Sequence, residues 1–206
     1  MTAMQFVLDG ERAAYGLCRP PGHHATTSLY GGYCFFNNAA IVAHHIATTR
    51  GVKVAVLDVD YHHGNGTQEI FYDRDDVLYL SLHGDPARAY PYAIGFADET
   101  GTGRGLGANL NIPLPARTGD DAYLSALDTA MQKATSFGAE VVVVSLGLDT
   151  FVTDPICDLA VTTDGFRRCG ELVAQAGLPT IVLQEGGYDV PNHGINTQSW
   201  LTGLGA

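Results

Sequence analysis

The chain has 206 residues, of which 46 % are hydrophobic and 16 % charged, a balance typical of a folded globular protein and not of a disordered one. Its 11 basic and 22 acidic residues give a net charge of −11 at pH 7, which argues against a duplex nucleic-acid binder because such a protein needs a basic face. We find no signal peptide and no long apolar span, and the four cysteines lack CxxC spacing. These features predict a cytoplasmic protein that is not inserted in a membrane.

Short apolar, β-rich runs alternate with helical patterns along the chain, which predicts a parallel sheet with crossover helices. The expected strands are 15–18, 52–58, 77–82, 141–146 and 180–184. The expected helices are 36–49, 120–137, 163–176 and a short one near 195–204. Candidate N-caps are Thr118 or Asp120 for the second helix and Thr162 or Thr163 for the third.

Two segments do not fit this alternation. The range 84–115 has neither helical nor strand periodicity and is rich in Gly, Pro and aromatic residues, so we interpret it as a long functional loop. The first six residues look like the interior of a helix and not like the start of a chain. That pattern predicts that an upstream segment is missing from the sequence.

Polar residues gather at the points where the five expected strands end. The segments concerned are 19–24, 58–65, 81–85, 147–150 and 185–188. Because parallel strands present their carboxyl ends at one edge of a sheet, we expect these segments to form the rim of an active site there.

The densest of these segments follows the apolar run 54–57, where strand alternation puts Asp58, Asp60 and His62 on one face. Buried acids on a parallel strand are costly, so a solvated acidic loop is the weaker interpretation. Asp60, His62 and Asp149 would supply two oxygens and one nitrogen and leave positions open, the donor pattern of a catalytic zinc. Ferrous iron is the alternative. Because such a metal polarises a carbonyl and lowers the pKa of water, the pattern indicates hydrolysis of an amide or ester.

Two adjacent histidines, His23 and His24, are the candidates for proton transfer from an attacking water to a leaving amine. Asp58 and Asn65 remain as their orienting partners. An aspartate raises the pKa of its histidine more than a neutral asparagine does, so we expect the asparagine-paired histidine to be the better base near neutral pH. Tyr188 follows two glycines and is interpreted as a hydrogen-bond donor to a developing oxyanion, with core packing as the alternative.

The motifs that carry these residues resemble the zinc-dependent deacetylase superfamily of histone deacetylases, acetylpolyamine amidohydrolases and related bacterial amidohydrolases. They occur in family order over nearly the whole chain: RPPGHHA, GGYCFFNN, LDVDYHHGNGTQ, SLHGDP, SLGLDTF and EGGY. Three segments are most similar to acetylpolyamine amidohydrolases: HGDPARAYPYAIGFADETG, LDTFVTDPI and EGGY. Histone deacetylases proper more often have a third glycine at the position of Glu185.

The resemblance implies the arginase/deacetylase fold, a three-layer α/β/α sandwich with a mostly parallel sheet. Residues 1–206 are then a single deacetylase catalytic domain that lacks the N-terminal portion of the family. In the polyamine enzymes that portion supplies acidic specificity residues and dimer contacts, so homodimer formation stays an open alternative.

The resemblance also assigns roles to individual residues. It implies that zinc is bound by Asp60, His62 and Asp149. It makes His24 the general base of the His23–His24 pair, and Tyr188 the oxyanion donor. Asp58 would support His23, and Asn65 would support His24.

Further roles implied by the resemblance concern the substrate and a second cation. Gly32 would offer its carbonyl to the substrate amide, and Tyr33 and Tyr90 would line a narrow tunnel for the acylated arm. A structural potassium ion would be held by Asp58, Asp60, His62, Ser81 and Leu82.

The leading hypothesis is therefore a zinc-dependent hydrolase that acts on a linear amide C–N bond. Its substrate would be a small cationic acetylated amine, with acetylpolyamines favoured. An acetyl-lysine protein deacetylase is the alternative with the same chemistry. An inactive metal-binding fragment is the alternative of another class.

Overall fold

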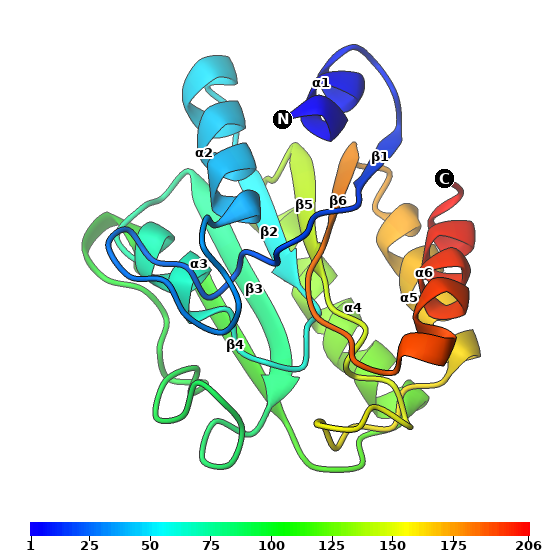
Figure 1. The fold of residues 1–206 in the computed structure, drawn as a ribbon. Coiled ribbons are helices and arrows are strands. Elements are labelled where there is room, and N and C mark those ends of the chain that lie inside the picture. Colours follow the sequence, from blue (N-terminus) through cyan, green and yellow to red (C-terminus); the bar gives the residue numbers. More distant parts are fainter.

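The computed structural model describes residues 1–206. Its strands are β1 (Ala13–Gly16), β2 (Val54–Asp58), β3 (Val77–Gly84), β4 (Asn109–Leu114), β5 (Val141–Leu146) and β6 (Thr180–Gln184). Its helices are α1 (Thr2–Leu8), α2 (Asn38–Arg50), α3 (Asn65–Phe71), α4 (Asp120–Phe137), α5 (Thr163–Gln175) and α6 (Val190–Leu204), with a 3₁₀ turn at Gly103–Gly105. The strands form one sheet in the order β1-β6-β5-β2-β3-β4, and every neighbouring pair is parallel (Figure 1).

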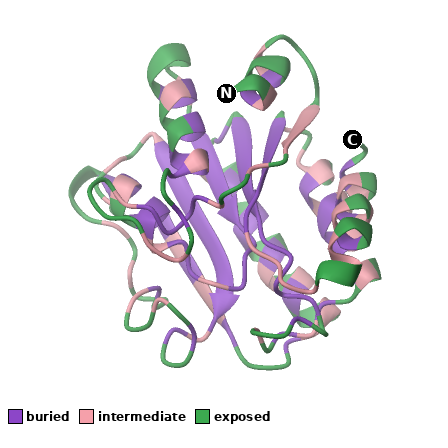
Figure 2. Cartoon of the chain, viewed as in Figure 1, coloured by how far each residue is buried: buried purple, intermediate pink, exposed green.

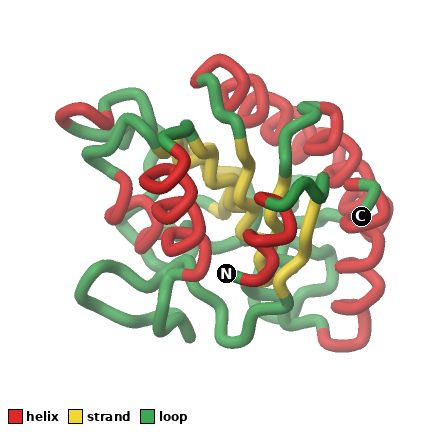
Figure 3. The backbone as a smooth tube through the Cα atoms, turned by 90° about the horizontal axis from the view of Figure 1, so that it is seen from above, coloured by secondary structure: helices red, strands yellow, loops and turns green.

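The sheet is covered by helices on both faces, which explains why its central strands are apolar over most of their length, with Asp58, Ser145 and Gln184 near their carboxyl ends. The strands β2, β5 and β6 are buried over their full length (Figure 2). Alternate residues of β2 enter different cores: Val54 and Val56 pack with α1 and α2, whereas Ala55 and Leu57 pack with α4, α5 and α6. Helices flank both sides of the strands (Figure 3), so the expected three-layer α/β/α fold is confirmed.

Most of the expected elements are present, with shifts at their ends. The expected strand 15–18 begins two residues earlier as β1, and the helix expected near 195–204 begins at Val190. The side chain of Asp189 caps that helix by accepting from Asn192 N, and Pro191 occupies its first turn. The expected range therefore omitted the first five residues of this helix.

The expected caps have different outcomes. The side chain of Thr162 accepts from Gly165 N at 3.0 Å and caps α5, as expected. The prediction for α4 was wrong, because its N-cap is Gly119 and no side chain caps it. Asp120 instead accepts from the backbone N and the hydroxyl of Thr162, and thereby joins the start of α4 to the start of α5.

Two elements were missed by the sequence prediction. The range expected to be one long loop contains β4, an edge strand whose buried Asn109 and Asn111 both donate to Gln68. An inward-facing polar pair removes the apolar alternation that identifies a strand, and Pro113 is tolerated because the strand is at the edge. The helix α3 has only seven residues and opens with Asn65-Gly66, which looks like a turn in the sequence.

The carboxyl ends of all six strands lie at one edge of the sheet, because the strands are parallel. The polar segments that follow β1, β2, β3, β5 and β6 therefore meet there, as the sequence predicts. None of the helices combines the length and the apolar character needed to span a membrane.

Candidate active site

Two buried carboxylates and one imidazole converge at the ends of the neighbouring strands β2 and β5. His62 Nδ1 lies 3.2 Å from Asp60 Oδ1 and 3.0 Å from Asp149 Oδ2. The second oxygen of each carboxylate is fixed by a backbone N–H: Gly186 N donates to Asp60 Oδ2 at 2.9 Å, and Tyr61 N donates to Asp149 Oδ1 at 2.7 Å. The three side chains are thus held in place by contacts with three different strand ends.

The electrostatics of this group suit a cation. Burial and the nearby charge of Asp60 raise the pKa of Asp149 to about 7. Burial alone would lower the pKa of His62, but its hydrogen bonds to Asp149 and Asp60 raise it to about 10. Two buried acids that share one imidazole leave negative charge uncompensated, and oxygen and nitrogen donors of this kind bind divalent metals. The side chains present therefore fit a metal ion.

A thiol that the sequence prediction missed lies beside this group. One ligand-type atom from each of His62, Asp149 and Cys157 falls within 4.8 Å of the other two. Burial, with the charges of Asp149 and Asp154, raises the pKa of Cys157 far above its usual value, so its thiol is protonated. Cys157 follows β5 by eleven positions, and no local sequence pattern indicated that it returns to the site.

The histidine pair lies next to these carboxylates with the partners expected from the sequence. His23 Nδ1 is 3.0 Å from Asp58 Oδ2, and His24 Nδ1 is 2.8 Å from Asn65 Oδ1. The two rings are 4.1 Å apart between centroids. Tyr79, which the sequence prediction missed, also donates its hydroxyl to Asp58 Oδ2, at 3.1 Å.

The two histidines differ in charge. Burial, reinforced by neighbouring His23, lowers the pKa of His24 to about 3, so its ring is neutral at pH 7. Burial also opposes the charged form of His23, but Asp58, with Asp60 and Glu185, raises its pKa well above the usual value. Both directions match the expectation drawn from an aspartate partner and an asparagine partner.

A cavity of about 370 Å³ opens onto His24 and onto His62, the imidazole that contacts Asp60 and Asp149. It is lined by His24, Gly32, Tyr33, His62, Tyr90, Ile156 and Tyr188. Tyr90 meets the ring of His24 edge-on at 4.9 Å, and the rings of Tyr33 and Tyr188 lie 6.3 Å apart. The residues predicted to contact substrate therefore line one cavity. Ile156 also lines it, although its only signal in the sequence was its place after Asp154-Pro155.

Tyr188 reaches the cavity from the turn after β6. Its backbone N donates to Asp154 Oδ2 at 2.8 Å, which fixes the backbone from which the side chain extends. Burial, with the charges of Asp60 and Asp149, raises the pKa of its phenol well above the usual value. The hydroxyl is therefore protonated at neutral pH and available as a hydrogen-bond donor.

The structure brings only some of the residues predicted to hold a second cation close to one another. Ser81 lies opposite Asp58 in the register of β2 and β3, and both are fully buried. The Ser81 hydroxyl is within 2.8 Å of His83 Nδ1. Leu82 is buried in the core that contains α4 to α6.

Gly32 has a position that only glycine can occupy. Its φ is +52°, and a Cβ built on it would lie 2.1 Å from His24 Cδ2. We expect Gly32→Ala to displace the His24 ring and to lower kcat by at least about tenfold, because small misplacements of a reacting group are costly. Steady-state kinetics check this, with Gly194→Ala as the control, since that helical glycine has open space around it. Unchanged kcat in Gly32→Ala would show that the ring tolerates the methyl group.

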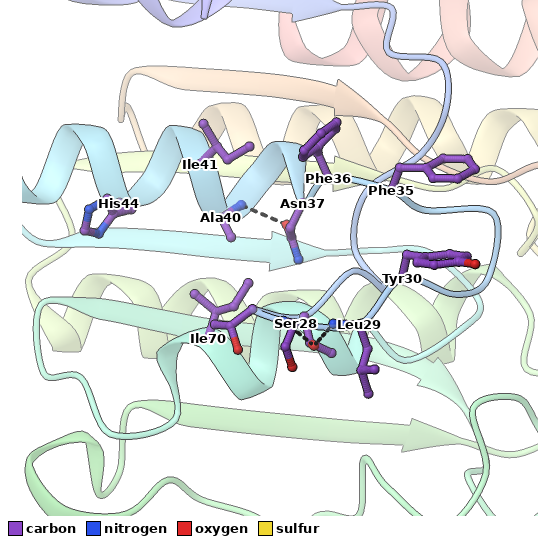
Figure 4. Close-up of a pocket in the computed structure, with 12 residues that line it drawn as sticks. Ser28, Leu29, Tyr30, Phe35, Phe36, Asn37, Ala40, Ile41, His44 and Ile70 are labelled. Atoms are coloured by element: carbon purple, nitrogen blue, oxygen red, sulfur yellow. Dashed lines mark hydrogen bonds between the residues drawn. The ribbon is translucent and has the colours of Figure 1, made fainter.

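A second cavity, of about 450 Å³, lies between α2 and the segment 26–36 (Figure 4). Its wall includes the stacked rings of Tyr30 and Phe35, whose centroids are 5.6 Å apart. It shares no lining residue with the first cavity and contains no carboxylate or thiol. Of these two cavities, only the first is lined by a member of the carboxylate–imidazole group, His62, and by His24 and Tyr188.

Comparison with known proteins gives concordant matches. The chain matches the family model of the histone deacetylase domain over residues 1–204. It is 48 % identical over 198 residues to the acetylpolyamine amidohydrolase of Mycoplana ramosa, covering 96 % of this chain and 58 % of that protein. It is 49 % identical over 203 residues to acetylpolyamine amidohydrolase 1 of Pseudomonas aeruginosa, covering 98 % of this chain and 59 % of that protein.

The fold agrees with a solved structure of the same kind. The crystal structure of acetylpolyamine aminohydrolase from Burkholderia pseudomallei matches with a TM-score of 0.94 at 48 % identity, covering 99 % of this chain and 59 % of that one. The chain thus spans less than two thirds of the length of the relatives it matches.

Proposed function

Because this chain belongs to the histone deacetylase family, we propose that it is a zinc-dependent amidohydrolase that removes the acetyl group from acetylpolyamines. The observation that carries the proposal is a single cavity lined by neutral His24, protonated Tyr188 and His62. His62 in turn contacts the buried carboxylates of Asp60 and Asp149. These are a proton acceptor, an oxyanion donor and a metal donor set, the three parts that amide hydrolysis needs. In this proposal residues 1–206 act as one catalytic domain.

The metal would be held by Asp60, His62 and Asp149. When bound, zinc would polarise the acetyl carbonyl and make water a stronger acid. Ferrous iron would suit the same donors, because nitrogen and carboxylate ligands accept either metal. A structural potassium ion would lie near Asp58, Asp60, His62, Ser81 and Leu82, where the buried carboxylates of Asp58 and Asp60 and the hydroxyl of Ser81 offer oxygen donors.

The proton transfers would be carried out by His24. Asn65 Oδ1 can only accept a hydrogen bond, so His24 Nδ1 carries the hydrogen and Nε2 keeps a free lone pair. Nε2 would take a proton from the attacking water and return it to the departing amine. His23, charged through Asp58, disfavours a second charge on His24 and so keeps the base neutral before the reaction.

The remaining cavity residues would hold the substrate. Tyr188 would donate its hydroxyl to the oxygen that becomes negative during attack. The carbonyl of Gly32 would accept the amide N–H of the substrate, and the rings of Tyr33 and Tyr90 would flank its aliphatic arm. The net charge of −11 favours the approach of a cationic amine.

The substrate class is tested by comparing acetate release from N-acetylputrescine with release from an acetyl-lysine peptide. We expect kcat/KM for acetylputrescine to be higher by at least about tenfold, a difference of roughly 1.4 kcal/mol in transition-state binding. The control is the zinc-loaded protein with a chelator in excess. A peptide that is hydrolysed as fast or faster would assign the chain to protein deacetylation instead.

A further inference from the structure

A buried carboxylate that does not line the substrate cavity lies directly behind the histidine pair. Glu185 is the first residue after β6, and only 6 % of it is exposed. Its Oε2 accepts hydrogen bonds from the backbone N of Gly22 at 2.6 Å and of His23 at 3.1 Å, whereas Oε1 has no partner. Burying a carboxylate is costly unless hydrogen bonds compensate for the lost water. The two bonds from Gly22 and His23 supply that compensation, and they indicate that the side chain binds this part of the backbone.

The backbone that carries this carboxylate is fixed to the sheet. Glu185 N donates to Leu146 O of β5 at 2.9 Å. The next residue, Gly186, donates its N–H to Asp60 Oδ2 at 2.9 Å, and Leu148 N donates to Gly186 O at 3.0 Å. The acceptor oxygen therefore sits on a rigid strand end that is also tied to a proposed metal donor.

The segment it holds is a loop that follows the edge strand β1, and a second set of backbone hydrogen bonds ties this loop to α3. The carbonyl of His23 accepts from Gly66 N at 3.1 Å and from Thr67 N at 3.2 Å, both in the first turn of α3. The peptides around His23 are thus held by α3 through the carbonyl and by Glu185 through the N–H groups. Since α3 also begins with Asn65, the partner of His24, removing the Glu185 contact would free one side of this segment only.

We propose that Glu185 is a positioning residue whose carboxylate fixes the histidine segment against the end of β6, and so sets the separation of His24 and Tyr188 across the substrate cavity. Glu185 does not line that cavity, so it acts through the backbone of Gly22 and His23. The inference rests on the proposed function, because the separation of His24 and Tyr188 matters for turnover only if both act in amide hydrolysis.

Position and charge are the two ways in which this carboxylate could act, and two conservative variants separate them. Glu185→Gln retains an acceptor oxygen at the same reach but removes the charge. Glu185→Asp retains the charge but withdraws the acceptor by one methylene group. If the hydrogen bonds position the segment, the glutamine variant keeps function and the aspartate variant loses it.

Two measurements on the zinc-loaded chain test this. With N-acetylputrescine as substrate, we expect kcat of Glu185→Asp to fall about 10- to 100-fold with little change in KM, and kcat of Glu185→Gln to stay within about threefold of the parent. Amide hydrogen exchange at Gly22 and His23 should become faster in Glu185→Asp only. Val143→Ala, a core change on β5, is the control for lost stability and should leave kcat unchanged.

The exchange measurement needs no turnover, so the inference can be judged even if the parent chain releases no acetate and the proposed function fails. Protected amides in the parent and in Glu185→Gln, with faster exchange in Glu185→Asp, would then still support the anchoring role. A loss of kcat or of amide protection in Glu185→Gln would overturn the proposal. Parent-like kcat and exchange in Glu185→Asp would overturn it as well.

Discussion

Replacing His24 with alanine is expected to lower kcat for N-acetylputrescine by about 10²- to 10⁴-fold, the usual contribution of a general base. The structure gives the physical reason, since His24 is neutral, faces the cavity and has its Nδ1 occupied by Asn65. The zinc content should be unchanged, because His24 does not belong to the group formed by Asp60, His62 and Asp149. Steady-state kinetics and metal analysis of the same preparation measure both quantities.

The matched control is His45→Ala on α2, whose side chain lines neither cavity. It should retain the parent kcat, which shows that loss of a histidine is not itself harmful. Near-parental turnover in His24→Ala would remove this residue from the role of general base. A loss of zinc together with kcat would instead indicate that His24 supports the metal site.

Tyr188→Phe is expected to lower kcat by about 10²- to 10³-fold, the effect of removing one donor from an oxyanion site. The change deletes only the hydroxyl, because the ring stays in the cavity wall and Tyr188 N keeps its bond to Asp154. KM should change little, since this hydrogen bond strengthens only as the carbonyl oxygen becomes negative. Comparison of kcat and KM for the parent and the variant separates the two contributions.

Tyr30→Phe provides the control for the tyrosine change, because its ring lines the second cavity and is 76 % exposed. It should leave both kinetic constants at the parental values. A Tyr188→Phe variant with a raised KM and an unchanged kcat would show that the hydroxyl binds the ground state and does not stabilise an oxyanion.

The sequence predicted the parts of the site that depend on local pattern. Asp60 and His62 are two positions apart after a buried strand, and alternation alone placed them on one face. The meeting of Asp149 with His62 also needed β5 to lie beside β2. The βαβ pattern predicts parallel strands but not their order, so the residues alone made Asp149 a candidate partner of Asp60 and His62, and the family resemblance implied the same set.

Features that depend on long-range polar contacts could not be found in the same way. Asn109 and Asn111 appear unsuited to a strand until Gln68 of α3 is beside them. The acceptor role of Glu185 involves Gly22, 163 positions away in the chain. Such contacts leave no periodic signal, because each side chain is explained by a partner that only the folded chain brings near.

Metal-dependent hydrolysis is tested most directly by acetate release from N-acetylputrescine by the purified chain, measured zinc-loaded, after chelation and after zinc is restored. Turnover is expected to disappear with the metal and to return with it, because Asp60, His62 and Asp149 would hold the ion beside His24 and Tyr188. Turnover that persists after complete metal removal would contradict this expectation. So would the absence of turnover in a folded chain with zinc bound.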